Sequence, residues 1–323
     1  MRLSKKPLSE GFELWDKGYY LGAMRLFIFK AETSPPFQLG ACLDAMGHLL
    51  ARLDEGADAK ENFGFAAEKY ELIQQPVLAK VMLVKGVAAE DPAAALPQVD
   101  ALIKEHDPEG KAHELQDAKL KSALARAYYT RAELLMETSD DNTATALKDA
   151  EYACAIGWER DHVAYYLAAT LQQQSGNVQG AMAALEKALS RNANFVMAYE
   201  ALVPLLLQQG DKERALSLLT KAIELHPKSA LIRQKAFTLS ESGNDAAALA
   251  MLDEYIATPP HEETEALVST PGAASATFLK AKAAIYADGG KMAEAQAAAE
   301  EALKHNPGDE EATKLLADIK ASQ

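Results

Sequence analysis

The sequence predicts an all-α protein, a solenoid of about eight helical hairpins with one further helix at the C-terminal end. The first observation is composition. Of the 323 residues, 49% are hydrophobic and about 60 are alanine, the strongest helix former. The second is that glycines, alanines and prolines recur in one register through the second half of the chain. Such self-similarity is typical of stacked helical repeats.

Three residue types share this register. Four glycines are spaced by 34, 33 and 47 residues, an alanine follows each of them five residues later, and three prolines repeat the spacings of 33 and 47. These positions are Gly176, Gly210, Gly243 and Gly290; Ala181, Ala215, Ala248 and Ala295; Pro227, Pro260 and Pro307. An alanine-rich composition does not account for glycines and prolines locked to the alanines.

Each unit has a simple physical logic. The apolar-periodic stretch 196–209 predicts a first helix, and Gly210 suits the left-handed position just past its end. Asp211 then suits the N-cap of a second helix over 213–225, as Asn177 and Asn244 do in neighbouring units. Pro227 prevents that helix from continuing. One such hairpin cannot bury its apolar face alone, so neighbouring hairpins must stack.

A unit of this kind resembles the tetratricopeptide repeat (TPR) family, which has a small residue late in the first helix, an Ala-x3-Phe-like pair in the second and a closing proline. The resemblance implies a right-handed superhelical solenoid whose concave groove binds protein or peptide partners. Ala299 and Ala193 depart from the pattern. The matching residues include Gly11, Leu14, Gly18, Ala23, Phe27 and Pro35; Ala169, Gly176, Ala181, Leu185 and Ala188; Leu202, Gly210, Ala215, Leu219, Ala222 and Pro227; Ala283, Tyr286, Gly290, Ala295, Ala302 and Pro307.

The resemblance covers nearly the whole chain with uneven quality. The predicted units are 4–37, 40–75, 76–109, 124–161, 162–195, 196–229, 230–260 and 276–309, followed by a capping helix over 310–320. The second unit fits only if 54–61 lengthens its turn, and the third lacks a turn glycine. The helix-favouring stretch 111–136 is expected to form a long first helix or an extra helix.

We therefore expect four regions: partly degenerate hairpins over 1–123, a central array over 124–260, an inserted loop over 261–275, and a last hairpin with its cap over 276–323. The insertion is either a tolerated surface loop or a partner-contacting arm or hinge that uses Leu267 and Val268. Pro204 lies inside a predicted first helix, where it either kinks the helix or widens the groove.

Net charge, hydropathy and cysteine content limit the partners and the location that we expect for the protein. The net charge is −14 and the pI is about 5.0, which disfavours nucleic acid as a partner. We expect no membrane insertion, because no run of eighteen apolar residues occurs. Cys42 and Cys154 are far apart and in no CxxC pair, which favours a reducing compartment and a cytoplasmic location.

No motif for catalysis is present. His113 and Glu114 begin like HExxH, but Asp117 stands where the second histidine belongs, so a zinc site is not predicted. The sequence has no phosphate-binding glycine loop and no GxSxG turn. We therefore expect a protein that is not an enzyme and that has no cofactor, no metal and no small-molecule substrate.

Carried over position by position, the TPR resemblance implies groove-facing residues on the first helices. These candidates are Tyr129, Tyr166, Thr170, Glu200, Lys235 and Lys280. Tyrosines among mixed charges suit peptide contact, although Tyr129 and Tyr166 could instead fill the space between hairpins.

Two functions fit these observations. The first is a non-catalytic scaffold, a subunit or assembly factor of a larger complex. The alternative is an adaptor or co-chaperone that docks a linear C-terminal peptide. Chaperone-binding members of the family use a clamp of Lys, Asn, Asn, Lys and Arg, and here Tyr166, Thr170 and Ala201 occupy positions of the clamp, with Lys235 the one near match.

Overall fold

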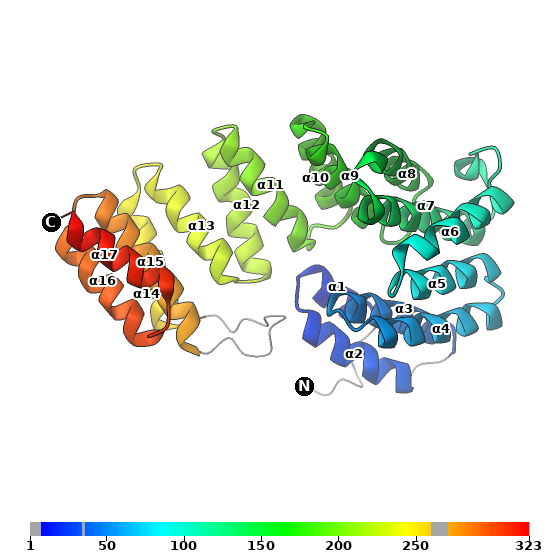
Figure 1. Cartoon of the computed structure of the whole chain (residues 1–323), viewed down its shortest axis with the longest axis horizontal. Helices are drawn as coiled ribbons and strands as arrows, with labels where there is room; N and C mark the ends of the chain where they lie inside the picture. The colour runs from blue at the N-terminus through cyan, green and yellow to red at the C-terminus, as the bar shows by residue number, and fades with distance from the viewer. Residues whose placement is uncertain (1–7, 34–35, 260–270, 323) are drawn as a thin grey trace. The chain divides into compact units, whose positions relative to one another are not determined.

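The computed structural model describes residues 8–33, 36–259 and 271–322, and within them all regular structure is helical (Figure 1). Consecutive helices pair into the eight predicted hairpins, and a final helix follows them. The helices are α1 (Leu8–Asp16), α2 (Tyr20–Thr33), α3 (Pro36–Arg52), α4 (Gly56–Leu72), α5 (Pro76–Ala88), α6 (Pro92–His106), α7 (Ala118–Thr138), α8 (Thr143–Ile156), α9 (His162–Gln174), α10 (Val178–Arg191), α11 (Val196–Gln208), α12 (Lys212–Leu225), α13 (Ser229–Ser240), α14 (Asp245–Ala257), α15 (Pro271–Asp288), α16 (Met292–His305) and α17 (Glu310–Ala321). The predicted fold class is confirmed.

The chain divides into two compact units, Met1–Ala198 and Tyr199–Gln323. In the first unit the odd-numbered helices α5, α7 and α9 contact one another in succession, as α13 and α15 do in the second unit. The odd-numbered helices are the first helices of their hairpins. Within each unit their side chains therefore lie on neighbouring surfaces, which is the arrangement that makes a shared groove in helical repeats.

The predicted turns form where glycine marks them. Gly176 has a φ of 78°, a conformation that costs glycine little. Its backbone N–H donates to the Gln173 carbonyl at 3.0 Å. Asn177 then caps α10, because its Oδ1 accepts from the backbone N–H of Gly180 at 3.0 Å. Asp211 caps α12 in the same way, whereas the side chain of Asn244 makes no capping hydrogen bond to α14.

The second hairpin differs from the expectation of a longer turn. Helices α3 and α4 are 17 residues each, and α4 begins at Gly56, so the turn stays short and the helices carry the extra length. Asp54 takes the left-handed position in that turn, with a φ of 62°.

The fourth hairpin decides between a long first helix and an extra helix over 111–136. Helix α7 is a single helix of 21 residues, and a short 3-10 turn over Ala112–Glu114 precedes it.

The C-terminal part ends in a helix that packs on the last hairpin, and one helix begins earlier than expected. The capping helix α17 buries Ala312 and Ile319 against the last hairpin, with Leu315 and Leu316 partly buried beside them. Helix α15 begins at Pro271, so residues 271–275 of the expected insertion are helical. Residues 260–270, with Leu267 and Val268, lie outside the described residues. Helix α11 continues through Pro204.

The core of each unit runs between stacked helices. Alanines at the helix crossings are fully buried, and large side chains fill the spaces between hairpins, which is the close packing that folded interiors require. The largest fully buried side chains include Phe27, Met82, Leu124, Leu134, Leu219, Ile232 and Phe278. Of the helices that the structure describes, none is both long and apolar enough to cross a lipid bilayer.

Candidate functional site

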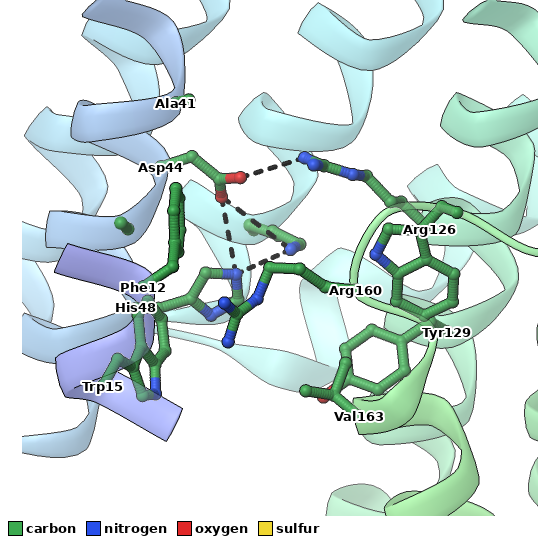
Figure 2. A pocket seen from close by; sticks show the side chains of 12 residues that line it. Phe12, Trp15, Ala41, Asp44, His48, Arg126, Tyr129, Arg160 and Val163 are labelled. Carbon is green, nitrogen blue, oxygen red and sulfur yellow. Dashed lines mark hydrogen bonds and ion pairs between the residues drawn. The ribbon is translucent and has the colours of Figure 1, made fainter. Parts of the chain in front are cut away.

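The first helices of the first unit surround a small hollow lined by rings and charges (Figure 2). Its volume is about 110 Å³. We call it the aromatic hollow, and its lining residues are Phe12, Trp15, Ala41, Asp44, Ala45, His48, Lys85, Arg126, Tyr129, Trp158, Arg160 and Val163. A second hollow of about 340 Å³ adjoins it and shares His48 and Lys85 with it. We call this one the acidic hollow, because Glu133 and Glu137 line it.

Helix periodicity places the charged groups on the inner side. Asp44 and His48 are four residues apart on α3 and so share one face of that helix. Lys85 is the last charged residue of α5, a helix that is otherwise almost wholly apolar. Its side chain is only 8% exposed. A lysine buried to this extent needs a polar partner.

These three residues and Arg126 form one buried cluster. Arg126 Nη1 donates to Asp44 Oδ2 at 3.0 Å, and Lys85 Nζ donates to His48 Nε2 at 2.8 Å. Asp44 Oδ1 lies 3.4 Å from His48 Nε2 and 4.0 Å from Lys85 Nζ. Figure 2 shows Asp44 at the meeting point of these contacts.

The electrostatics of the cluster are consistent with a neutral histidine between charged neighbours. Burial, reinforced by Lys85, lowers the pKa of His48 to about 3, so the imidazole is neutral and its Nε2 can accept a hydrogen bond from the Lys85 ammonium group. Burial alone would raise the pKa of Asp44, but Lys85, His48 and Arg126 together lower it. Asp44 therefore remains a carboxylate.

Tyr129 and Glu133 lie beside this cluster on α7. The Tyr129 hydroxyl donates to Glu133 Oε1 at 2.5 Å, and the Tyr129 ring lies 5.5 Å from the ring of Trp158. Burial raises the pKa of Glu133 to about 7. Glu133 is therefore a carboxyl group whose charge changes near neutral pH.

The raised pKa of Glu133 predicts a measurable pH dependence. A carboxyl group with a higher pKa in the folded state than in the unfolded state stabilises the fold less as the pH rises between the two values, here from 4.5 to about 7. We expect Glu133→Gln to become more stable relative to the wild type over this range, by about 1–3 kcal/mol.

The measurement is urea unfolding of both proteins between pH 5 and 8. His48 contributes in the opposite sense, since its lowered pKa costs stability as the pH falls, so the difference between the two proteins is the relevant quantity. Glu71→Gln, an exposed change on α4, is the matched control. A stability difference that does not vary with pH would contradict the raised pKa.

A second buried cluster joins the two ends of the first unit. Asp16, at the end of α1, accepts hydrogen bonds from Arg160 Nη2 at 2.6 Å and from Asn192 Nδ2 at 2.7 Å. Its Oδ1 lies 3.4 Å from His162 Nε2. The guanidinium group of Arg160 also lies 4.9 Å from the ring centroid of Phe12. We call these four polar residues the Asp16 clasp: Asp16, Arg160, His162 and Asn192.

Among the six residues predicted for the groove, three lie in the first unit. Tyr129 lines the aromatic hollow. Tyr166 and Thr170 are on the neighbouring helix α9, both partly exposed. The Tyr166 ring lies edge-on to Phe195 at 5.5 Å, and Thr170 Oγ1 donates to the Tyr166 carbonyl at 3.1 Å.

The other three lie in the second unit. Glu200, on α11, pairs with Lys228 at 2.7 Å. Lys235, on α13, is partly exposed. Lys280, on α15, pairs with Asp309 at 2.9 Å and with Glu311 at 2.8 Å, so it ties α15 to the start of the capping helix.

Sequence reasoning missed the residues of the two buried clusters. A signal was available for Lys85, because a lysine late in an apolar helix must find an internal partner.

Within the described residues no cluster of His, Cys, Asp and Glu is arranged to hold a metal ion. Cys42 and Cys154 are free thiols, and burial raises their pKa values to about 11 and about 12.

Comparison with known families agrees with this architecture. Models of the tetratricopeptide repeat match residues 162–195 and 206–269. The chain contains tetratricopeptide repeats at these positions. No curated protein matches its sequence at a significant level.

Comparison with solved structures gives a match of similar fold and further, weaker matches. A chain in the crystal structure of the APC/C hetero-tetramer Cut9–Hcn1 is 13% identical with a TM-score of 0.51; the match covers 95% of the present chain and 54% of that one. The present chain thus spans about half the length of that protein. YrrB, a TPR protein with an unusual peptide-binding site, is 20% identical with a TM-score of 0.45 over 65% of this chain and 97% of its own. A thermophilic TPR protein from Thermus thermophilus is 22% identical with a TM-score of 0.39, over 61% of this chain and 99% of its own.

Proposed function

We propose that this protein is a non-catalytic protein-interaction scaffold, a subunit or assembly factor of a larger complex. The observation that carries the proposal is the succession of first helices that contact one another within each unit: α5, α7 and α9 in the first, α13 and α15 in the second. Repeats stacked in this way present an extended surface that suits a protein or peptide partner.

The groove candidates differ in their exposure and in their contacts within each unit. Tyr129 contacts Glu133 and Trp158 inside the first unit, and Lys280 is held by two acidic side chains of the C-terminal cap. Tyr166, Thr170 and Lys235 are partly exposed. We therefore propose that these three residues make direct contacts, Tyr166 and Thr170 on the first unit and Lys235 on the second. In the second unit the ion pair of Glu200 with Lys228 offers a further group that a partner can engage.

Charge reversal at Lys235 tests this proposal. We expect Lys235→Glu to lower the recovery of co-purifying proteins by at least about tenfold, since a central contact in an interface is worth about 2 kcal/mol or more. The measurement is native co-purification from the source cell, with quantitative mass spectrometry of the partners. Lys221→Glu, an exposed reversal on the second helix α12, is the matched control.

The recovered set separates the two functions predicted from the sequence. A stable, stoichiometric set of proteins that is lost in Lys235→Glu and kept in Lys221→Glu supports a complex subunit. Substoichiometric chaperones would instead support the adaptor that docks a C-terminal peptide. Equal recovery with both variants would contradict the groove assignment, and recovery of no partner by the wild type would contradict the scaffold function.

A further inference from the structure

We propose that the aromatic hollow binds a small carboxylate, with the carboxyl group placed among Lys85, Arg126 and Arg160. The inference goes beyond the scaffold function, because it concerns a ligand held inside the first unit rather than a partner on its surface. Three features of the hollow carry it: an excess of positive charge, hydrogen-bond donors that are not used, and an apolar wall of suitable size.

The charges around the hollow do not balance. Three cationic side chains line it, and Asp44 is the one carboxylate in the lining. Asp16 adds a second carboxylate through its contact with Arg160. Glu133, in the adjoining hollow, interacts with Lys85 and has a pKa of about 7, so one positive charge is in excess whenever Glu133 is protonated. Glu159 approaches Arg126 only to 4.0 Å, and its side chain is 74% exposed, so water screens it. A buried excess of charge is costly unless a counter-ion compensates it.

The cationic side chains also carry N–H donors that the hydrogen bonds described above do not use. Arg126 Nε is buried and has no partner within the described residues. The ammonium group of Lys85 has three donors, and the contact with His48 uses one of them. Buried donors in folded proteins almost always find an acceptor. A carboxylate is the acceptor that best suits an arginine beside a lysine.

The walls fix the size and the character of the rest of the ligand. Figure 2 shows Phe12 and Trp15 on one side of the hollow, Tyr129 and Val163 on another, and Arg160 between them. The volume of about 110 Å³ is somewhat below the roughly 150 Å³ of a cavity that accepts benzene. The space suits a carboxylate with a short apolar tail and excludes a folded peptide segment.

The protein carries its own reporter for this site. It has two tryptophans, and both line the aromatic hollow. Titration of the full chain with isovalerate should therefore give a saturable change in tryptophan emission. Isovaleramide has the same shape without the charge, and we expect it to bind at least about tenfold more weakly, since hydrogen bonds between two charged groups are stronger than those to a neutral amide. Inorganic phosphate is the third probe.

A filling variant locates the site. Val163→Phe occupies the hollow without removing a charge, and we expect it to weaken isovalerate binding at least tenfold while partner recovery stays unchanged. Val178→Phe, a partly exposed valine on α10 outside the hollow, is the matched control. The comparison of carboxylate and amide on the wild type needs no variant, so it holds even where Val163→Phe fails to fold.

Four outcomes would overturn the proposal. The first three are no saturable emission change with isovalerate, an amide that binds as well as the carboxylate, and a Val163→Phe variant that folds and still binds isovalerate as the wild type does. Binding of phosphate in preference to isovalerate would also overturn it, because the site would then recognise an oxyanion without the apolar tail.

Discussion

Asp16→Ala is expected to destabilise the first unit by about 3 kcal/mol, since breaking a buried ion pair by removing one partner costs about 3–5 kcal/mol. Arg160 keeps 19% of its side chain exposed, so water compensates part of the loss and the lower end of that range applies. Burial alone would raise the pKa of Asp16, but hydrogen bonds and charge from His162 and Arg160 lower it. The native cluster is therefore built around an ionised carboxylate.

The measurement is urea unfolding followed by tryptophan emission. Trp15 and Trp158 both belong to the first unit, so this signal reports the unfolding of that unit. Glu13→Ala is the matched control: Glu13 is on the same helix and pairs with Lys17 at 2.7 Å, but its side chain is 49% exposed, so we expect a change of about 0.5 kcal/mol or less. Equal shifts for the two variants would show that the Asp16 clasp does not stabilise the unit.

The hairpin architecture could be predicted because glycine carries the turn signal in the second half of the chain. Gly176, Gly210 and Gly290 all have φ values between 72° and 80°, a region that favours glycine over other residues. In the second hairpin the same conformation is taken by Asp54, with a φ of 62°, and after α4 by Gln74, with a φ of 58°. Because neither residue is glycine, the repeat register could not be recognised there, and the sequence appeared to need a longer turn.

The site could be predicted only in part, for a different reason. The family pattern places Tyr129 and Tyr166 on first helices, and helix periodicity is a local property of the sequence. The partners of Asp16 lie 144 to 176 residues away along the chain, so no local pattern indicates them. Asp44 and Arg126 meet across 82 residues for the same reason: the stacking of hairpins, rather than any motif, brings them together.

The two clusters also bear on one another through Arg160. Arg160 belongs to the Asp16 clasp and also lines the aromatic hollow. Helix α1 likewise takes part in both, because Phe12 and Trp15 line the hollow and Asp16 pairs with Arg160. A ligand that draws on the charge of Arg160 would compete with Asp16 for it. Ligand binding is therefore expected to weaken the contact between Asp16 and Arg160, and a closed clasp is expected to weaken ligand binding.

Phe278→Ala is expected to destabilise the second unit by about 3–5 kcal/mol. Phe278 is fully buried on α15, and its ring lies 5.8 Å from that of Tyr255 on α14. Truncation leaves a cavity between these hairpins that the surrounding helices cannot fill without losing their own contacts. In a repeat array each hairpin interacts mainly with its neighbours, so the loss should concentrate in α13 to α17.

Hydrogen exchange resolved along the chain measures this distribution. We expect faster exchange in α13 to α17 of Phe278→Ala and unchanged exchange in α1 to α8, because stability in such arrays is the sum of local terms and interfaces between neighbours. Phe65→Ala is the matched control, because Phe65 is 42% exposed on α4 and little cavity forms there. A uniform acceleration along the whole chain would mean that the two units unfold together, and no acceleration in α13 to α17 would mean that Phe278 does not hold the second unit.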